Sequence, residues 1–260
     1  MSRYIMFSFD DGREDTYRNA YRILKKFGFV GTINITSDFI LHEKNYKCFK
    51  TCLNKSMSKE EILECQINGW EIAAHGSTHT NNIDDLLFGI QQLKEMGVDV
   101  KNIGFASPGS YLTEYNNKDF MNLVNNGRLA YIRSGLQTRR EGYIFILLTL
   151  INRLIHNKYL FYLLRNKVIL KNNKKKFILS LGITKYTSLN EVIYFLNKLN
   201  DNEGVILAFH SILSPDDKGY DVDKRYWDCK TLEGVCSYLY QNKKYIMIKT
   251  IDWFNDNNKM

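Results

Sequence analysis

Short β-prone runs alternate with helical patterns along almost the whole chain, and this alternation constrains the fold more than any other feature. Between the runs, apolar residues recur at helical spacing. The predicted strands are 4–9, 29–35, 70–74, 102–106, 129–132, 177–181, 204–209 and 245–248, and the predicted helices are 16–27, 58–68, 84–96, 115–124, 189–199 and 232–241. Repeated strand–helix–strand units favour an α/β fold around a parallel sheet, with enough units to close a barrel.

Residues with reactive or metal-binding side chains stand directly after several predicted strands. They are Asp10 and Asp11 after the first strand, His75 and His79 after the third, and His210 after the penultimate one. In parallel β/α folds, functional groups collect at the carboxyl ends of the strands. We therefore expect these five side chains to meet at one end of the barrel.

The residue types in this group suit a metal site with proton transfer beside it. Two adjacent carboxylates point in different directions, so one can bind an ion while the other moves a proton. Histidines four residues apart, such as His75 and His79, can be aimed at one ion by a tight loop. One carboxylate and two histidines leave coordination positions open, as catalytic sites do. His210 ends an apolar strand and suits a general acid or base.

Each of these residues also has a plainer interpretation when it is taken alone. Asp10-Asp11-Gly12 is typical of a turn, His79 of a surface or capping residue, and His210 of a hydrogen-bonded core histidine. Their order and their position after strands favour the metal site. His42 and His156 are expected to be bystanders. Trp70 and Tyr111 could line a sugar site, but packing in the core is the more expected use of both aromatic side chains.

The motifs around these residues resemble those of the polysaccharide deacetylase family, whose shared domain is named after the nodulation deacetylase NodB. Ser8 to Gly12 resembles Thr-Phe-Asp-Asp-Gly, and Leu207 to His210 matches Leu-x-x-His. His75 to His79 resembles His-(Ser/Thr)-x-x-His, with Gly76 in the Ser/Thr position. The resemblance covers nearly the whole chain except roughly residues 139–176. It implies a distorted (β/α) barrel of about seven strands.

The resemblance also implies a reaction and a role for each residue. Asp11, His75 and His79 would bind one divalent ion, with zinc expected and cobalt, nickel or manganese as alternatives. Asp10 would be the general base and His210 the general acid. The implied enzyme is a hydrolase that removes an acetyl group from an N-acetylated or O-acetylated sugar in polysaccharide or cell-envelope metabolism, and so acts on non-peptide carbon–nitrogen bonds. The alternatives are hydrolysis of another amide and a non-catalytic sugar- or membrane-associated homologue.

Two of the family's motifs differ in this chain. The third usually reads Arg-x-Pro-Tyr-Gly, but Ala106 to Ser110 contains no arginine. Arg133, on the next strand, is predicted to approach Asp10 in its place. Pro108 and Tyr111 are predicted to support the site, the loop at Pro108 by a backbone N–H directed at the reacting oxygen. The family's aromatic-acidic fourth motif has no clear counterpart.

The net charge of +8 is concentrated in one segment. No acidic residue lies between Glu141 and Glu191, while nine Lys and Arg residues do. Because the remainder of the chain is nearly neutral, a nucleic-acid-binding surface across the fold is not expected. We expect a single catalytic domain over residues 1–260, with an insertion at about 139–176.

The insertion is predicted to contain an apolar helix from Tyr143 to Leu164, whose uninterrupted apolar run is too short to span a bilayer. Its polar residues form one narrow stripe, made of Thr149, Asn152, Arg153, His156 and Asn157. The apolar remainder needs a cover, and packing on the barrel or on a second subunit of a homo-oligomer is preferred. The alternative is peripheral contact with an anionic membrane, in which the lysines at 174–176 meet lipid headgroups.

The cysteines and the N-terminal residues bear on the cellular compartment. The five cysteines are an odd set without paired spacing, and Cys48 and Cys52 lack the second half of a zinc site, so free thiols are expected. The first residues include no long apolar run of the export type. A cytoplasmic location is therefore expected, at the inner membrane face if the membrane alternative holds.

Overall fold

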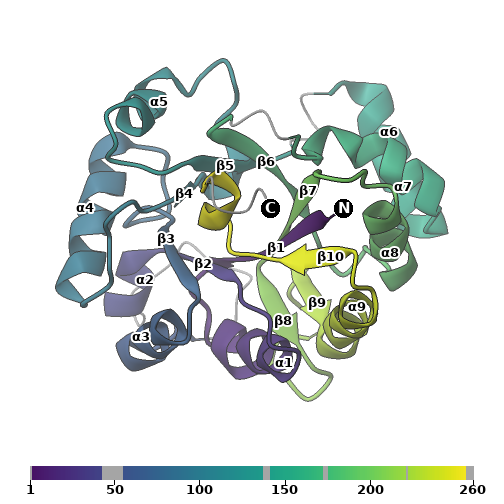
Figure 1. Ribbon diagram of the computed structural model, residues 1–260, viewed down its shortest axis with the longest axis horizontal. Coiled ribbons are helices and arrows are strands. Elements are labelled where there is room, and N and C mark those ends of the chain that lie inside the picture. The colour runs from purple at the N-terminus through teal and green to yellow at the C-terminus, as the bar shows by residue number, and fades with distance from the viewer. Residues whose placement is uncertain (1, 43–54, 137–140, 172–174, 221, 256–260) are drawn as a thin grey trace.

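A closed parallel barrel forms the centre of the protein (Figure 1). The computed structural model describes residues 2–42, 55–136, 141–171, 175–220 and 222–255. In these ranges, eight parallel strands follow the order β10-β1-β2-β3-β4-β5-β6-β7, and β1 also pairs with β7. They are β1 (Arg3–Asp11), β2 (Thr32–Ile35), β3 (Glu71–Ala74), β4 (Phe105–Ala106), β5 (Ile132–Gly135), β6 (Phe177–Gly182), β7 (Gly204–Phe209) and β10 (Tyr245–Met247). The predicted α/β barrel of seven strands is confirmed, with β10 added beside the first half of β1.

Helices surround the barrel in Figure 1. Those of the described residues are η1 (Thr16–Tyr21), α1 (Arg22–Lys26), α2 (Ser37–Leu41), α3 (Lys59–Ile67), α4 (Ile83–Glu95), η3 (Pro108–Ser110), α5 (Lys118–Asn125), α6 (Tyr143–Ile155), α7 (Lys158–Arg165), η5 (Asn166–Val168), α8 (Leu189–Asn197), α9 (Cys229–Gln241) and η6 (Ile251–Phe254). A second, two-stranded sheet pairs β8 (Ser211–Leu213) with β9 (Tyr226–Asp228). No helix in this part of the chain is both long and apolar enough to cross a bilayer.

Strand β1 is buried on both faces, and its alternating side chains serve two cores. The residues that join the large core beneath the helices are Ile5, Phe7 and Phe9. Tyr4 and Met6 belong to a smaller cluster with Tyr131 and Ile206. Asp10 continues the row that Tyr4 and Met6 begin, and the strand thus positions its carboxylate at the barrel mouth.

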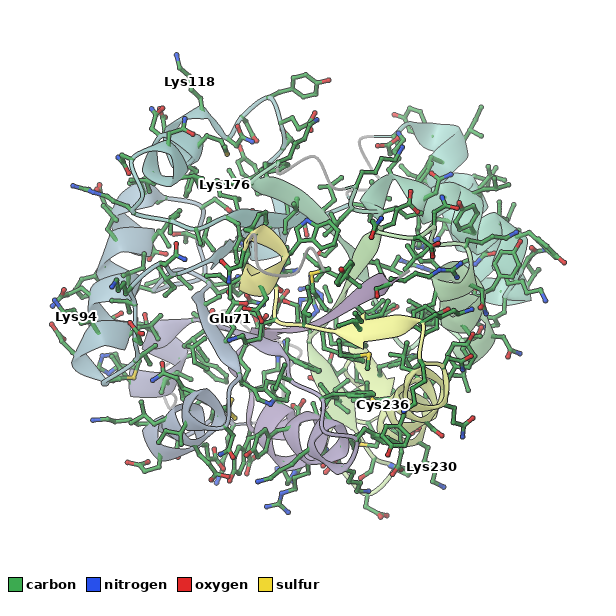
Figure 2. All side chains as sticks on the ribbon, in the orientation of Figure 1. Glu71, Lys94, Lys118, Lys176, Lys230 and Cys236 are labelled. Atoms are coloured by element: carbon green, nitrogen blue, oxygen red, sulfur yellow. The ribbon has the colours of Figure 1, made fainter. Side chains whose placement is uncertain are left out.

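The amino-terminal end of the barrel is closed by the end of the chain. Buried Glu71 accepts hydrogen bonds from the hydroxyls of Thr32 and Tyr131, both at 2.8 Å, and from the Ile251 N–H at 2.9 Å. Figure 2 shows Glu71 beside η6 in the middle of the view. Burial raises the pKa of this carboxyl above its ordinary value, although the three hydrogen bonds act in the opposite direction.

Three sequence-based expectations about the elements are corrected. The single helix expected from Tyr143 to Leu164 is two helices, because His156 takes left-handed backbone angles (φ 49°) and Asn157 caps α7 by accepting from two backbone N–H groups. The polar stripe is also divided. Thr149 and Asn152 are buried, whereas Arg153, His156 and Asn157 are exposed. The strand expected at 129–132 is β5, which begins at Ile132 where pairing with β6 starts. Elements α2, β8 and β9 were not predicted.

Candidate functional site

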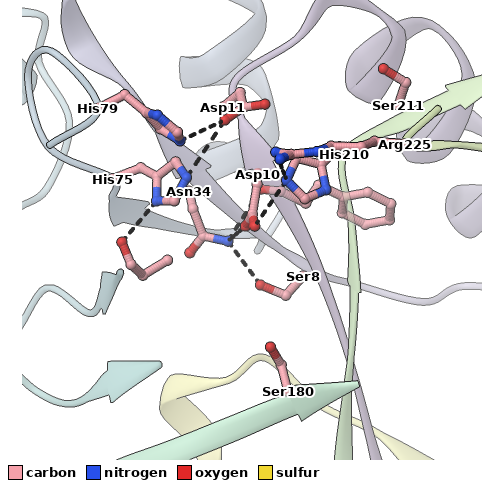
Figure 3. A network of polar contacts seen from close by, with 12 residues as sticks. Ser8, Asp10, Asp11, Asn34, His75, His79, Ser180, His210, Ser211 and Arg225 are labelled. Atoms are coloured by element: carbon pink, nitrogen blue, oxygen red, sulfur yellow. Dashed lines mark hydrogen bonds and ion pairs between the residues drawn. The ribbon is translucent and has the colours of Figure 1, made fainter. Parts of the chain in front are cut away.

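Asp11, His75 and His79 form a compact group of metal-binding atoms at the carboxyl ends of β1 and β3 (Figure 3). One ligand atom from each lies within 4.8 Å of the others. Asp11 Oδ1 is 3.5 Å from His75 Nε2 and 3.6 Å from His79 Nε2. This oxygen is buried and has no hydrogen-bond partner among the described residues. A buried carboxylate oxygen facing two imidazole nitrogens fits a divalent cation.

Backbone groups orient the histidines. His75 Nδ1–H donates to the Ala106 carbonyl at 2.7 Å, which leaves the lone pair of Nε2 directed toward Asp11. The chain turns sharply at Gly76 (φ 81°), and Asp85 of α4 accepts hydrogen bonds from the backbone N–H groups of the next two residues. A Cβ at Gly76 would lie 2.6 Å from Asp85 Oδ2, which explains why glycine stands in the motif's Ser/Thr position.

Arg13, a residue that the sequence did not single out, holds the other oxygen of Asp11. Its Nε and Nη2 lie 2.8 and 2.7 Å from Asp11 Oδ2, while Nη1 lies 2.9 Å from Asp223 and 2.6 Å from the Ser211 hydroxyl. Burial opposes ionisation of Asp11, yet the Arg13 guanidinium and the nearby His75 hold its pKa well below the ordinary value. Arg13 therefore keeps Asp11 charged and leaves Oδ1 available.

Asp10 is held by one partner from the adjacent strand β2 and one from β5 on the other side of the barrel. Its Oδ1 accepts from Arg133 Nη2 at 2.5 Å and from Asn34 Nδ2 at 2.8 Å. Arg133 lies on β5 and also donates to Ser180 on β6 at 3.0 Å. Burial alone would raise the pKa of Asp10, but Arg133, followed by His75 and His210, lowers it. The structure thus places Arg133 where the sequence predicted, on the carboxylate that the usual motif arginine would orient.

His210 follows β7, the strand that pairs with β1, and lies beside Asp10. Its Nε2 is 4.0 Å from Asp10 Oδ2 and 3.5 Å from Arg225 Nη1. Burial lowers the pKa of His210 to about 4, even though Asp11 and Asp10 favour its charged form. His79 is shifted the same way, to a pKa of about 4, by burial and by His75. Both imidazoles are therefore neutral at pH 7 in the metal-free protein.

The loop at Pro108 was predicted to direct a backbone N–H at the reacting oxygen. The backbone N–H groups of Ser107, Ser110, Tyr111 and Leu112 all donate within the protein, and Pro108 has no N–H. The contact of a loop N–H with the reacting oxygen stays a prediction. Core packing is confirmed for Trp70, which lies against Phe9, but it is wrong for Tyr111, which is 56% exposed.

The remaining candidates lie apart from this group. His42 is exposed 4.0 Å from Asp38, and His156 lies 3.4 Å from Glu191 at the end of α6. Cys65, Cys229 and Cys236 are free thiols, while Cys48 and Cys52 lie outside the described residues. Arg225, Asp223 and Ser211 are further site neighbours that sequence reasoning missed, since they come from a stretch without any recognised motif.

Comparisons with known proteins bear on the fold and the family. A family 4 acetyl xylan esterase from Clostridium thermocellum, in complex with a cobalt ion, is 14% identical, with a TM-score of 0.52 over 96% of this chain and 90% of that one. The Xyl-CE4 domain of a multidomain xylanase from the hindgut metagenome of Trinervitermes trinervoides is 15% identical, with a TM-score of 0.52 over 99% and 92%. A family 4 carbohydrate esterase from Bacillus anthracis is 14% identical, with a TM-score of 0.50 over 97% and 82%.

At these identities the solved structures show the shared fold. No curated protein matches the chain. The family model described as polysaccharide deacetylase matches residues 1–116, which contain the first strand with Asp10 and Asp11 and the loop with His75 and His79. Residues 1–116, less than half of the chain, therefore resemble the polysaccharide deacetylase family.

Proposed function

We propose that this carbohydrate deacetylase is a metal-dependent hydrolase that removes an acetyl group from an N-acetylated or O-acetylated sugar in polysaccharide or cell-envelope metabolism. The observation that carries the proposal is the unpartnered, buried Oδ1 of Asp11, which faces Nε2 of His75 and Nε2 of His79 beside the Asp10–Arg133 pair. These side chains lie together at one mouth of the barrel, which supports a metal site with proton-transfer groups beside it.

The ligand set supports a divalent ion, with zinc as our first choice and cobalt, nickel or manganese as alternatives. Two imidazoles and one carboxylate are a usual catalytic zinc set with open coordination positions. A bound ion would polarise the acetyl carbonyl and lower the pKa of bound water. His75 is fixed for binding by its hydrogen bond to Ala106, and Asp11 is kept ionised by Arg13.

Asp10 and His210 are proposed to move the protons. Asp10 is ionised and held in place by Arg133 and Asn34, so it can take a proton from the attacking water. His210, 4.0 Å from Asp10, is proposed to deliver a proton to the leaving nitrogen or oxygen of the sugar. Because His210 is neutral at pH 7, it must first gain this proton, and nearby Asp10 is the proposed source. Tyr111 is proposed to contact the sugar from its exposed position.

Acetate release from a panel of acetylated amino-sugar oligomers and nucleotide- or lipid-linked acetylated sugars tests the proposal. We expect activity that is lost after chelation and restored by one divalent ion per chain. His75→Ala should lose both the bound ion and the activity, whereas His42→Ala, at an exposed histidine away from the site, should keep both. Full activity in His75→Ala protein from which the metal ion has been removed would contradict the metal assignment.

The two alternatives have different signatures in the same assays. An enzyme for another amide would bind the ion with the same residues but release no acetate from any member of the panel. A non-catalytic homologue would bind sugar without turnover, and its binding would be insensitive to Asp10→Asn. The expected cytoplasmic location stays a prediction.

A further inference from the structure

Helix α6 presents its apolar residues to the outside and its polar residues to the protein. Thr149 and Asn152 are buried beneath it. Apart from Arg153, its exposed side chains are instead large and apolar, with Tyr143 92% and Leu154 83% exposed. With the exposed residues of α7, the set forms what we call the α6–α7 face, namely Tyr143, Ile144, Leu147, Leu150, Ile151, Leu154, Ile155, Tyr159 and Leu163. An apolar surface of this extent marks an interaction site.

This orientation of α6 is fixed by a buried polar contact. Asn152 Nδ2 donates to Glu191 Oε1 at 2.6 Å, and Glu191 has no exposed surface. Glu191 also closes the capping box of α8 with Ser188. Rotating α6 to bury its apolar residues would break this contact and leave a buried carboxylate with fewer partners, which is costly. The apolar residues therefore face outward because the inward polar contacts require it.

Charge around the face selects the occupant. The segment between Glu141 and Glu191 contains no acidic residue, and exposed Arg153 and Lys158 lie on the two helices themselves. In a symmetric dimer through this face, the same cations would approach each other, which is unfavourable. Apolar side chains bordered by cations match an anionic lipid surface. There the acyl chains contact the apolar side chains and the lipid phosphates contact the cations.

We propose that the α6–α7 face docks on a bilayer surface that contains anionic phospholipid. The helices lie at the edge of the molecule beside α8 (Figure 1). Thr149 of α6 and Phe161 of α7 line a cavity of about 190 Å³ together with Ser180 and Gly182 at the end of β6. Since Ser180 also accepts from Arg133, docking holds the end of the barrel that carries Asp10 close to the lipid.

Vesicle co-sedimentation of the full chain tests the proposal without any need for activity. We expect binding to phosphatidylcholine vesicles that contain phosphatidylglycerol, little binding to phosphatidylcholine alone, and weakening by salt. Leu147→Gln combined with Leu154→Gln should reduce partitioning by at least tenfold. Arg153→Gln combined with Lys158→Gln should reduce it by about 25-fold at low salt, about fivefold for each cation.

Matched controls lie on the far side of the molecule. Ile67→Gln combined with Phe88→Gln removes two exposed apolar residues of α3 and α4, and Lys94→Gln combined with Lys118→Gln removes two exposed cations. Figure 2 shows Lys94 at the left edge, opposite α6 and α7, and Lys118 at the top of the molecule, away from both helices. All controls should bind as the wild type does. The proposal would be overturned if the wild type did not bind vesicles or bound neutral vesicles equally well. It would also be overturned if the wild type formed a concentration-dependent dimer instead of binding vesicles, and Leu147→Gln/Leu154→Gln abolished that dimer.

Discussion

Asp11 has two oxygens in opposite surroundings, and that asymmetry defines the chemistry of the site at the residue scale. Oδ2 is held by Arg13, while Oδ1 has no hydrogen-bond partner among the described residues. Asp10, one residue earlier, is held by Arg133 and Asn34 instead. Adjacent carboxylates thus have separate cationic partners from different parts of the chain, which allows them separate functions.

Replacing Arg13 tests this arrangement through stability. Arg13→Met would leave Asp11 and Asp223 buried without their shared cation, so unfolding free energy should fall by about 3–5 kcal/mol. Arg18→Met, which removes an exposed arginine 2.6 Å from Asp217, is the matched control and should cost less than about 1 kcal/mol. Urea denaturation of metal-free protein measures both, and equal losses in the two variants would contradict the role of Arg13.

Replacing Asp10 or Asp11 separates the proposed base from the proposed ligand. Asp10→Asn should keep the metal ion and lose nearly all turnover, because the amide cannot accept the proton from water. Asp11→Asn should lose most metal affinity, since Oδ1 no longer carries charge. Metal content by mass spectrometry and acetate release together decide the matter. Loss of the ion in Asp10→Asn would show that the two roles are exchanged.

His210 makes stability depend on pH. Its pKa of about 4 in the folded protein is below the ordinary value of 6.5, so between these pH values the unfolded chain binds a proton that the folded protein does not. Stability should therefore fall as pH decreases from 6.5 to 4, by up to about 3 kcal/mol from this group. His210→Gln should flatten that part of the profile in metal-free thermal denaturation, while His42→Gln should leave it as in the wild type. A His210→Gln profile as steep as wild type would exclude His210 as the cause.

At the scale of elements, sequence signals within a few neighbouring residues predicted the helices and strands well. Contacts between residues far apart in the chain were predicted poorly. The capping box at Ser58 begins α3, and the alternation of strands and helices predicted the barrel because each signal lies within a few neighbouring residues. Arg13 follows Gly12 in a charged run that is typical of a solvated turn, and only its partners Ser211 and Asp223, far along the chain, bury it. The break between α6 and α7 was missed because His156 adopts a left-handed conformation that residue preference does not favour.

The loop between β3 and α4 gives a test at this scale. Gly76→Ser would restore the residue usual in the motif but would place a Cβ 2.6 Å from Asp85 Oδ2, at a φ of 81°. We expect a stability loss of about 1–3 kcal/mol and weaker metal binding, because Asp85 organises the loop that carries His79. Gly109→Ser, also at positive φ but with no atom within 4 Å of its Cβ, isolates the contribution of backbone strain. Equal effects of both variants would show that the contact with Asp85 is unimportant.

At the scale of the whole molecule, the two ends of the barrel are built differently. The carboxyl end carries charged groups around a ligand site, whereas the amino end is closed by η6 and the Glu71 contacts. The Glu71 contacts connect β2, β3 and the segment before β5 to η6, the last described helix. A change at Glu71 should therefore alter the unfolding free energy of the whole barrel.

The raised pKa of Glu71 determines the sign of its contribution. A carboxyl that is harder to ionise when folded contributes stability below its unfolded pKa and loses it as pH rises through the folded value. Glu71→Gln, which stays neutral, should therefore be less stable relative to wild type at low pH than at neutral pH. Urea denaturation at a series of pH values measures the difference, and Glu203→Gln, outside this contact set, is the control. A constant difference between Glu71→Gln and wild type across pH would contradict the prediction.

The pairing of β1 has a consequence for synthesis. Phe9 pairs with Phe209 and Arg3 with Tyr245, so β1 completes its pairing only with strands that are synthesised about 200 residues after it. About 200 residues at the usual elongation rate correspond to roughly 10–40 s during which a nascent chain has β1 without β7. Throughout that interval Asp10 and Asp11 remain hydrated. The candidate ligands Asp11, His75 and His79 are all synthesised early, but the barrel around them closes only when β7 pairs with β1.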